Sequence, residues 1–305
     1  MLLSNWVHKI VSNLNSTLRF GISTVENYGI LKSNPKSTIR NPKFYFLLFF
    51  FFSTQVFATR ILIPMDENQK NHLKAYGIAF WELKRDQDVD WLLNYRDGSF
   101  MLQFSEAAEK ECRVRGVSYE VISEGQTSQI LSEIAKPEVN MELVKLHKAP
   151  RIAVYSPKTK QPWDDAVTLV LTYAEIPYET IFDDEVLNGK LPLYDWLHLH
   201  HEDFTGQYGK FYSNFANAAW YQAEVRESEA MAAKHGFKKV SELKLAIAKK
   251  IRDFTSGGGF LFAMCSATDS YDIALAADGV DICESMFDGD PADPQADAKL
   301  NFNNT

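Results

Sequence analysis

One cysteine of the sequence stands where a reactive thiol would be placed. Cys265 follows the apolar run 260–264 and precedes a polar segment expected to enter a helix near Thr268. The residues two positions before and after it are alanines, and a tight strand-to-helix turn needs small side chains there. The dipole of the following helix favours the thiolate form, and N–H groups around Ser266 offer an oxyanion site. The pattern predicts a nucleophile elbow centred on Cys265.

Two other interpretations of this cysteine stay open. Cysteine is often a small buried hydrophobe, and a strand-to-helix turn is an ordinary place for one. In an exported protein Cys265 and Cys283 can also form a disulfide, which would leave Cys112 unpaired.

A second group of reactive side chains lies in segment 194–203, which reads YDWLHLHHED. If its first part is a strand, His198 and His200 point to the same face. Three more polar residues follow at the carboxyl end of that strand. Two imidazoles with a carboxylate suit Zn²⁺ or Fe²⁺. The expected ligands are His198, His200, His201 and Asp203.

The same cluster has two interpretations without a metal. His198, His200 or Glu202 can supply the base that activates Cys265, because neighbouring strand ends open onto one crevice. Alternatively, this is a polar strand end whose histidines bond to loop backbone. Segment 205–210 (TGQYGK) reads as a loop suited to covering a site.

The segments from residue 150 onward alternate between strand and helix patterns. Such alternation predicts an α/β domain with a doubly wound, mostly parallel, flavodoxin-like sheet, which binds ligands at the carboxyl ends of its strands. Glycines turn the chain into the last strand, and we expect Gly258, Gly259 and Ser266 to shape the turn and an oxyanion site. The expected strands are 151–155, 178–182, 194–199 and 260–264. The expected helices are 163–174, 217–235, 241–254 and one from 268.

A smaller α/β domain is expected before it, at 59–145. Period-two and helical patterns alternate here as well, with a hairpin turning at Asp97-Gly98 and Ser105 as a helix cap. Segment 145–150 reads as a linker. The expected strands are 60–64, 91–95, 99–104 and 118–122, and the expected helices are 68–83, 105–115 and 127–135.

The first 58 residues indicate export. Residues 44–57 are almost wholly apolar, follow Lys43 and end in Val56-Phe57-Ala58. This run is shorter than the roughly 20 residues that a membrane span needs, and small residues suit signal cleavage. We expect a signal peptide at 42–58 cut near Ala58, a periplasmic or extracellular mature protein without a stable membrane span, and a mis-assigned start that adds residues 1–41.

The charge of the remaining chain argues against nucleic acid as a partner. Residues 1–58 hold six basic residues and one acidic residue, so 59–305 hold 26 basic and 39 acidic residues and a net charge of −13. Such a surface repels phosphate backbones. With 46% hydrophobic residues the chain can bury a core, and a small-molecule or peptide-like substrate is expected.

Three stretches carry a resemblance to a known family: 163–166 (WDDA), 194–210 and 258–270. They resemble an exported bacterial family commonly labelled "asparagine synthetase B", over most of 59–305. The elbow on a doubly wound sheet is similar to the class I glutamine amidotransferase-like fold. The resemblance implies hydrolysis or transfer at an amide or acyl group, with Cys265 as nucleophile and His198, His200 or Glu202 assisting.

The residues do not carry the chemistry of that label. A B-type asparagine synthetase needs an N-terminal cysteine and a Ser-Gly-Gly-x-Asp-Ser loop, whereas the expected mature N-terminus is Thr59 and segment 256–260 lacks the Asp-Ser pair. Class I amidotransferases place a histidine and a glutamate after the cysteine, and no histidine follows His235. A C-terminal truncation, another base or the absence of a triad stay open. Two rival functions are a metal-dependent hydrolase and a non-catalytic ligand-binding protein.

Overall fold

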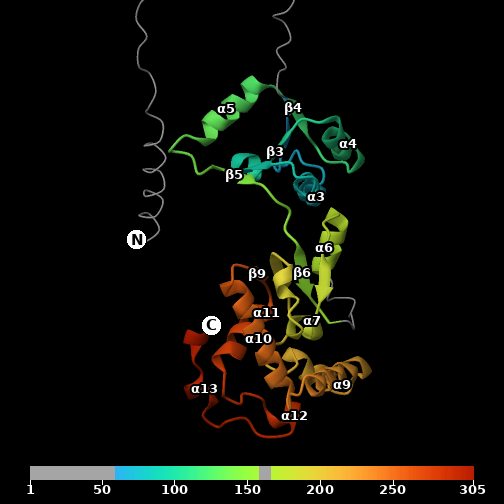
Figure 1. The fold of residues 1–305 in the computed structure, drawn as a ribbon, viewed down its shortest axis with the longest axis vertical. Helices are drawn as coiled ribbons and strands as arrows, with labels where there is room; N and C mark the ends of the chain where they lie inside the picture. Colours follow the sequence, from blue (N-terminus) through green and yellow to red (C-terminus); the bar gives the residue numbers. More distant parts are fainter. Residues whose placement is uncertain (1–58, 158–165) are drawn as a thin grey trace, which may run out of the picture. The chain divides into compact units, whose positions relative to one another are not determined.

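The computed structural model describes residues 59–157 and 166–305, and these contain two β-sheets of different kinds (Figure 1). The first sheet has five antiparallel strands, and the second has four parallel strands. The predicted mixed α/β fold with a parallel sheet is confirmed. The expected signal peptide, the N-terminal extension and the start of the helix at 163–174 lie outside the described residues.

The antiparallel sheet has the order β4-β1-β3-β2-β5. Its first four strands and the two helices between them follow the βαββαβ order of a split βαβ motif. The strands are β1 (Arg60–Ile63), β2 (Val89–Leu93), β3 (Phe100–Gln103), β4 (Glu120–Ile122) and β5 (Glu142–Leu146). The helices are α3 (His72–Lys84), α4 (Glu106–Val114) and α5 (Glu124–Ile134).

Capping side chains decide where these helices begin. Ser105 caps α4 as predicted, since its side chain accepts from the N–H of Ala108. Helix α3 begins later than expected because the side chain of Asn71 accepts from a backbone N–H of the first turn. Helix α5 begins earlier because Ser123 and Gln126 form a capping box.

Strand β5 was not predicted from the sequence, because its last residues fall in the expected linker 145–150. It pairs antiparallel with β2 at the edge of the sheet. The strand is half exposed, and charged residues Glu142 and Lys145 interrupt its apolar pattern. An edge strand needs only one neighbour and a weak apolar face, so its sequence signal is weak.

The parallel sheet has the order β7-β6-β8-β9. The first connection leads from β6 to β7, and the next returns past β6 to β8, so β6 lies between them. The strands are β6 (Ile152–Tyr155), β7 (Glu179–Ile181), β8 (Trp196–Leu199) and β9 (Phe260–Ala263). The helices are α6 (Ala166–Ala174), α7 (Asp183–Leu187), α8 (Tyr212–Phe215), α9 (Ala219–Lys234), α10 (Val240–Ser256), α11 (Ser266–Ala276), α12 (Ser285–Asp288) and α13 (Ala296–Lys299).

One face of this sheet forms a core with α10 and α11. Leu197 and Leu199 of β8 are fully buried in one cluster with Ile247 of α10 and Leu275 of α11. Successive side chains of a strand alternate between the two faces, which places the next residues of β8 and β9 on the opposite side.

The last strand of the parallel sheet is only partly buried, although all of its residues are apolar. Phe260 and Phe262 of β9 are 59% and 46% exposed, while the alternate residues Leu261 and Ala263 are half-buried against the core. Strand β9 lies at the edge of the described sheet, so the apolar run reflects one packed face and one accessible face.

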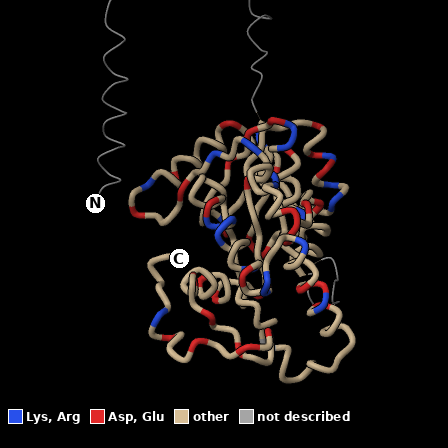
Figure 2. The backbone as a smooth tube through the Cα atoms, turned by 60° about the horizontal axis from the view of Figure 1, so that its bottom comes forward, with Lys and Arg blue, Asp and Glu red and all other residues tan. Residues whose placement is uncertain are grey.

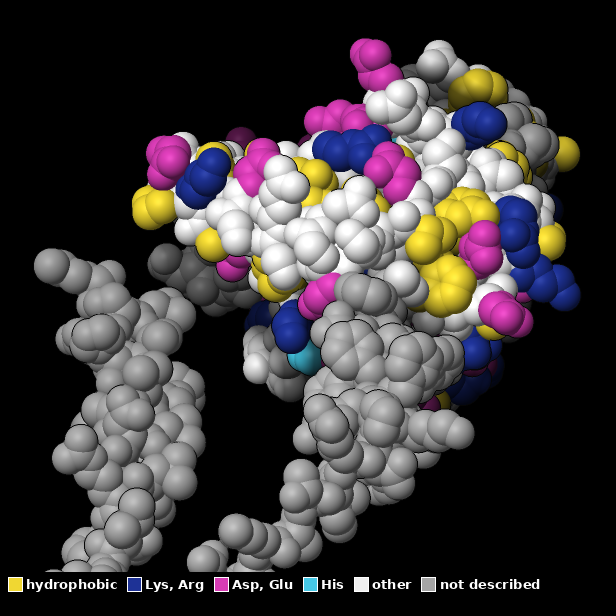
Figure 3. All heavy atoms as spheres, turned by 90° about the horizontal axis from the view of Figure 1, so that it is seen from above, with side chains coloured by type: hydrophobic (Ala, Val, Ile, Leu, Met, Phe, Trp, Pro, Cys, Tyr) yellow, Lys and Arg dark blue, Asp and Glu magenta, His cyan; other side chains and the backbone are white. Residues whose placement is uncertain are grey.

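Charged side chains are mixed over the described surface. Figure 3 shows acidic and basic side chains scattered over one face, among hydrophobic and other side chains. Acidic positions dominate the loops near the C-terminus in Figure 2, where residues 278–305 hold seven acidic residues and one lysine. No helix in the part of the chain that the structure describes is long and apolar enough to cross a membrane.

Candidate functional site

Cys265 lies in a strained turn between β9 and α11. Its backbone has φ 57° and ψ −143°, a conformation that residues with a Cβ rarely adopt. Holding a residue in such a backbone conformation costs about 1–3 kcal/mol, and the strain persists only where the surrounding structure enforces it. The thiol is exposed. The predicted strand-turn-helix arrangement is therefore present, and Cys265 is not a buried hydrophobe.

The other two cysteines are buried, and all three thiols are free. The alternative of a disulfide between Cys265 and Cys283 is therefore wrong for this structure. Cys283 donates a hydrogen bond from Sγ to the carbonyl of Thr205 at 3.2 Å. Burial raises the pKa of Cys283 and of Cys112 to about 12, which keeps both as thiols at neutral pH.

The pairing of β8 with β9 brings the backbone of His201 close to the turn that carries Cys265. Leu199 and Ala263 are register partners, so the residues two positions further on leave the same edge of the sheet together. The hydroxyl of Ser266 donates to the carbonyl of His201 at 3.0 Å. The start of α11 is thus fastened to the loop after β8.

That loop is further ordered by hydrogen bonds around Glu202. Its carboxylate accepts from the N–H of His200 at 2.8 Å, and its carbonyl accepts from the hydroxyl of Ser270 at 2.7 Å. Burial raises the pKa of Glu202 above its usual range. The Nδ1 atoms of His200 and His201 lie 2.9 Å apart, so one nitrogen donates and the other accepts, and the accepting ring is neutral.

His198 is placed differently from the rest of the predicted cluster. Its ring is 5% exposed, stacks on Phe262 with centroids 5.4 Å apart, and lies 6.5 Å from the ring of His200. Burial lowers its pKa to about 4, and its Nε2 has no hydrogen-bond partner in the described structure. The geometry gives His198 a packing position on strand β8.

The four predicted metal ligands do not gather into one site. Among the described residues, one group of three has its ligand atoms within 4.8 Å of one another, namely Asp281, Cys283 and Asp288. The ammonium of Lys239 already lies among these acids, 2.6 Å from Asp281 and 3.0 Å from Asp288. A lysine therefore compensates their charge.

The two predicted glycines lie at the wrong end of β9 for an oxyanion site. Gly258 has φ 102° in the turn after α10, a conformation that glycine adopts without strain. A Cβ at Gly259 would lie 2.2 Å from the ring of Phe254. Strand β9 separates both glycines from Cys265, at roughly 3.3 Å per residue. Of the three predicted residues, Ser266 alone adjoins the thiol.

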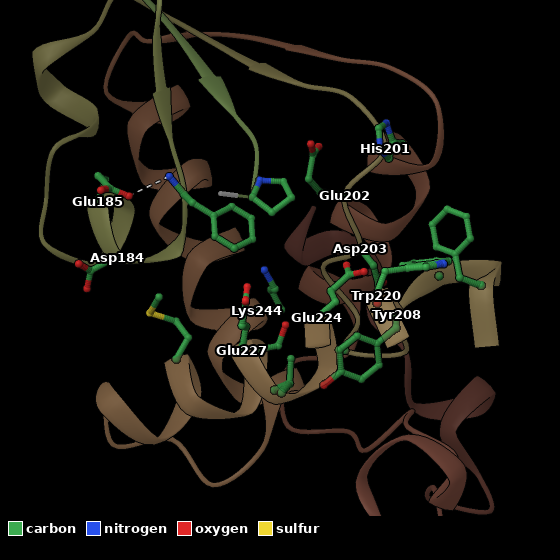
Figure 4. Close-up of a pocket in the computed structure, with 18 residues that line it drawn as sticks. Asp184, Glu185, His201, Glu202, Asp203, Tyr208, Trp220, Glu224, Glu227 and Lys244 are labelled. Atoms are coloured by element: carbon green, nitrogen blue, oxygen red, sulfur yellow. Dashed lines mark hydrogen bonds between the residues drawn. The ribbon is translucent and has the colours of Figure 1, made fainter. Parts of the chain in front are cut away.

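A cavity of about 150 Å³ opens at the carboxyl ends of β6, β7 and β8 (Figure 4). It is lined by the loop after β8, by α7 and by α9 and α10. His201, Glu202 and Asp203 line it, whereas His198, His200 and Cys265 do not. The lining residues from the two long helices were not predicted from the sequence, and they are Trp220, Glu224, Glu227, Ser228, Met231, Val240 and Lys244.

A buried polar group supports the floor of this cavity. Lys244 is 6% exposed and lies 2.9 Å from each carboxylate oxygen of Asp183 and 3.1 Å from the hydroxyl of Tyr155. Tyr155 also donates to Asp183, and burial together with that carboxylate raises the pKa of Tyr155. The sequence contains one sign of this buried polar group, because Lys244 interrupts the apolar stripe of α10.

Comparison of the chain with family models, with curated proteins and with solved structures gives no match.

Proposed function

We propose that this protein is a cysteine-dependent hydrolase or acyl transferase that acts on an amide or a similar acyl group, with Cys265 as nucleophile. The observation that carries the proposal is the backbone of Cys265, which combines a positive φ with an exposed thiol at the start of an eleven-residue helix. Strain of this kind is concentrated at active sites. It presents the sulfur beyond the sheet edge while the first N–H groups of α11 point at the same region.

The proposed reaction uses two neighbouring residues. The thiolate of Cys265 attacks the acyl carbon, and the C–S bond forms as a tetrahedral oxyanion develops near the N–H groups of α11. The imidazole of His201 accepts the thiol proton and returns it to the leaving amine as the C–N bond breaks. Water or another acceptor then cleaves the thioester. His201 replaces His198 as the assisting residue, because His198 is buried in packing.

The strand order supports the finer fold assignment within this proposal. The order β7-β6-β8-β9 corresponds to the first four strands of the doubly wound order 2-1-3-4-5, in which ligands bind where the winding reverses. The cavity lies at that place, beside β6 and β8. This supports the amidotransferase-like assignment. The proposal extends to an exported member of the family described above, on the sequence resemblance alone, and leaves asparagine synthesis out.

One observation favours a second candidate, a non-catalytic ligand-binding protein. The cavity lining does not include Cys265, so a ligand can occupy the cavity without touching the thiol. This candidate predicts binding without covalent chemistry.

Acyl transfer to the protein separates the two candidates. With p-nitrophenyl acetate, we expect a burst of one p-nitrophenolate per chain and one acetyl group on Cys265, seen by peptide mass spectrometry. Cys265→Ser should abolish the thioester, His201→Ala should slow the burst by about 100-fold, and Cys112→Ala should behave as the parent. Equal acetylation of the parent and Cys265→Ser would overturn the proposal.

A further inference from the structure

Strand β9 has a free edge at the margin of the parallel sheet (Figure 1). It pairs with β8 along one edge, and no other strand of the described residues pairs with it. The N–H groups of Phe260 and Met264 donate to backbone carbonyls of the β8 segment at 3.0 and 3.1 Å. Because the backbone groups of successive strand residues point to opposite edges, the N–H and C=O groups of Leu261 and Ala263 point away from β8.

The exposed side chains of this strand form one apolar row. Phe260, Phe262 and Met264 are 59%, 46% and 39% exposed. They lie on the same face, because the side chains of a strand alternate between its two faces. Rings of β8 fix the two phenylalanines, since Trp196 packs edge-to-face on Phe260 and His198 stacks on Phe262. The row is therefore a preformed surface.

The free edge lacks the features that keep sheet edges from pairing with other chains. Proteins protect exposed edges with charged side chains, prolines, bulges or a covering element. Residues 254–268 contain no charged residue and no proline. The register of β9 with β8 runs without a bulge. An edge of this kind is a template for a further strand.

The distribution of charge favours a second copy of this chain at that edge. Residues 59–305 carry a net charge of −13, so two copies repel each other over most of their surfaces. Since 254–268 is uncharged, no like charges oppose each other when two such edges meet.

A two-fold axis perpendicular to the sheet at Phe262 makes the edge complementary to itself. The strands then run antiparallel, and Leu261 lies opposite Ala263 of the second copy as a pair that exchanges two hydrogen bonds. The symmetric pair exchanges two more, so all the free backbone groups of these residues are satisfied. In this register Phe262 lies opposite Phe262 of the second copy, and Phe260 lies opposite Met264. The exposed row of each copy thus covers that of the other.

We propose that β9 is the interface of a two-fold dimer in which two four-stranded parallel sheets join edge to edge. The three exposed side chains offer on the order of 100 Å² each, hence roughly 600 Å² for the two copies. Stable interfaces bury about 1,200–2,000 Å². The dimer is therefore weak, with dissociation in the micromolar range. It does not depend on the chemistry of Cys265.

Sedimentation velocity of the full chain, from about 1 µM to about 200 µM, tests for this dimer. We expect a concentration-dependent shift from monomer to dimer. Phe262→Asp places two carboxylates opposite each other on the axis and should weaken the association by about tenfold or more. Phe302→Asp is the matched control, because Phe302 is 57% exposed and lies outside β9. It should associate as the parent does.

A disulfide tests the register. In the double variant Cys265→Ser/Phe262→Cys, the two introduced thiols meet on the axis with their Cα atoms about 4.5 Å apart, a distance that a disulfide spans. Oxidation by copper phenanthroline in air should link most chains into dimers. In Cys265→Ser/Phe260→Cys the introduced thiols are displaced along the strands by roughly 13 Å, so this control should stay unlinked.

Three outcomes would overturn the dimer. The first is a monomer at every concentration, and the second is association that Phe262→Asp leaves unchanged. The third is a monomeric chain that binds a labelled peptide of alternating valine and threonine, because the edge then accepts a foreign strand. Linking of the Phe260→Cys variant in place of the Phe262→Cys variant would overturn the register. Circular dichroism checks the fold of each variant, and the disulfide test decides the matter if Phe262→Asp misfolds.

Discussion

At the scale of single residues, the conformation of Cys265 is the most informative feature. A residue with a Cβ is held at φ 57°, although glycine would fit that conformation without strain. Selection for stability alone would favour glycine here. Under the proposed function, the thiol serves the reaction at the expense of stability.

Replacing Cys265 with glycine should therefore stabilise the protein. We expect the free energy of unfolding of Cys265→Gly to be about 1 kcal/mol higher than that of Cys265→Ala, because alanine keeps the strained Cβ. Urea unfolding followed by circular dichroism measures this. The control Ala230→Gly, at an exposed position of α9, should lose about 1 kcal/mol. A less stable glycine variant at position 265 would show that the turn is unstrained.

His198 makes a pH dependence predictable. Its pKa is about 4 in the folded protein and near 6.5 in the unfolded chain, so between these values the unfolded chain binds more protons. Stability is therefore fully present above pH 6.5 and falls as the pH drops toward 4, by on the order of 3 kcal/mol.

The variant His198→Phe should lose most of this dependence, since phenylalanine can still stack on Phe262 and does not titrate. Urea unfolding at pH 4.5 and at pH 7.5 gives the comparison. His147, an exposed histidine paired with Asp88, serves as the control, and His147→Phe should retain the dependence of the parent. A parent protein equally stable at both pH values would contradict the account of His198.

At the scale of elements, the buried group around Lys244 joins three parts of the parallel-sheet region. Asp183 begins α7, Tyr155 ends β6 and Lys244 belongs to α10. Since Asp183 is fully buried, it cannot lose its counter-ion without a large penalty.

Lys244→Met should therefore destabilise the protein by about 3–5 kcal/mol, and the double variant Lys244→Met/Asp183→Asn should recover most of that loss. The measurement is the free energy of unfolding in a double-mutant cycle. Lys249→Met, which breaks the half-exposed pair of the same helix with Asp278, should cost less than about 1 kcal/mol. An undiminished loss in the double variant would mean that packing of the lysine stem, rather than its charge, is what matters.

The elements themselves were largely predictable from local patterns, whereas their contacts were not. Apolar periodicity identified the four strands of the parallel sheet and the long helices, and the alanines around Cys265 identified the turn. Strand β5 was not predicted, because the apolar pattern of an edge strand is weak. The ion pair below the cavity was not predicted either, because Lys244 and Asp183 are 61 residues apart in the sequence and periodicity carries no information over that separation.

The histidine cluster shows the same limit. The order of strands in the sheet determines which neighbour a strand end receives, and the sequence does not state that order. Pairing of β8 with β9 places the backbone of His201, and not that of His198, next to the turn that carries Cys265. The sequence therefore identified which residue types gather at this strand end. Which of them lies near the turn at Cys265 follows only from the order of the strands in the sheet.

At the scale of the whole molecule, the excess of acidic residues has a consequence for stability. Residues 59–305 carry a net charge of −13, and like charges repel in the compact state. Added NaCl screens that repulsion over distances beyond about 10 Å at 0.1 M.

Raising NaCl from 0.02 M to 0.5 M should therefore increase the free energy of unfolding by about 1 kcal/mol. Thermal or urea unfolding at fixed pH 7.5 measures it. A loss of stability with salt would mean that ion pairs such as Arg151–Asp195 and Arg96–Asp66 outweigh the general repulsion.

The central claim is that Cys265 is a nucleophile assisted by His201, and the rate of its alkylation by iodoacetamide tests it most directly. The other two thiols are buried, so labelling of the parent reports on Cys265, with Cys265→Ser as the blank. Because the proposed reaction uses the imidazole of His201 as the base, alkylation at pH 7.5 should be about tenfold slower in His201→Ala than in the parent. An equal rate of alkylation in the two proteins would contradict the claim.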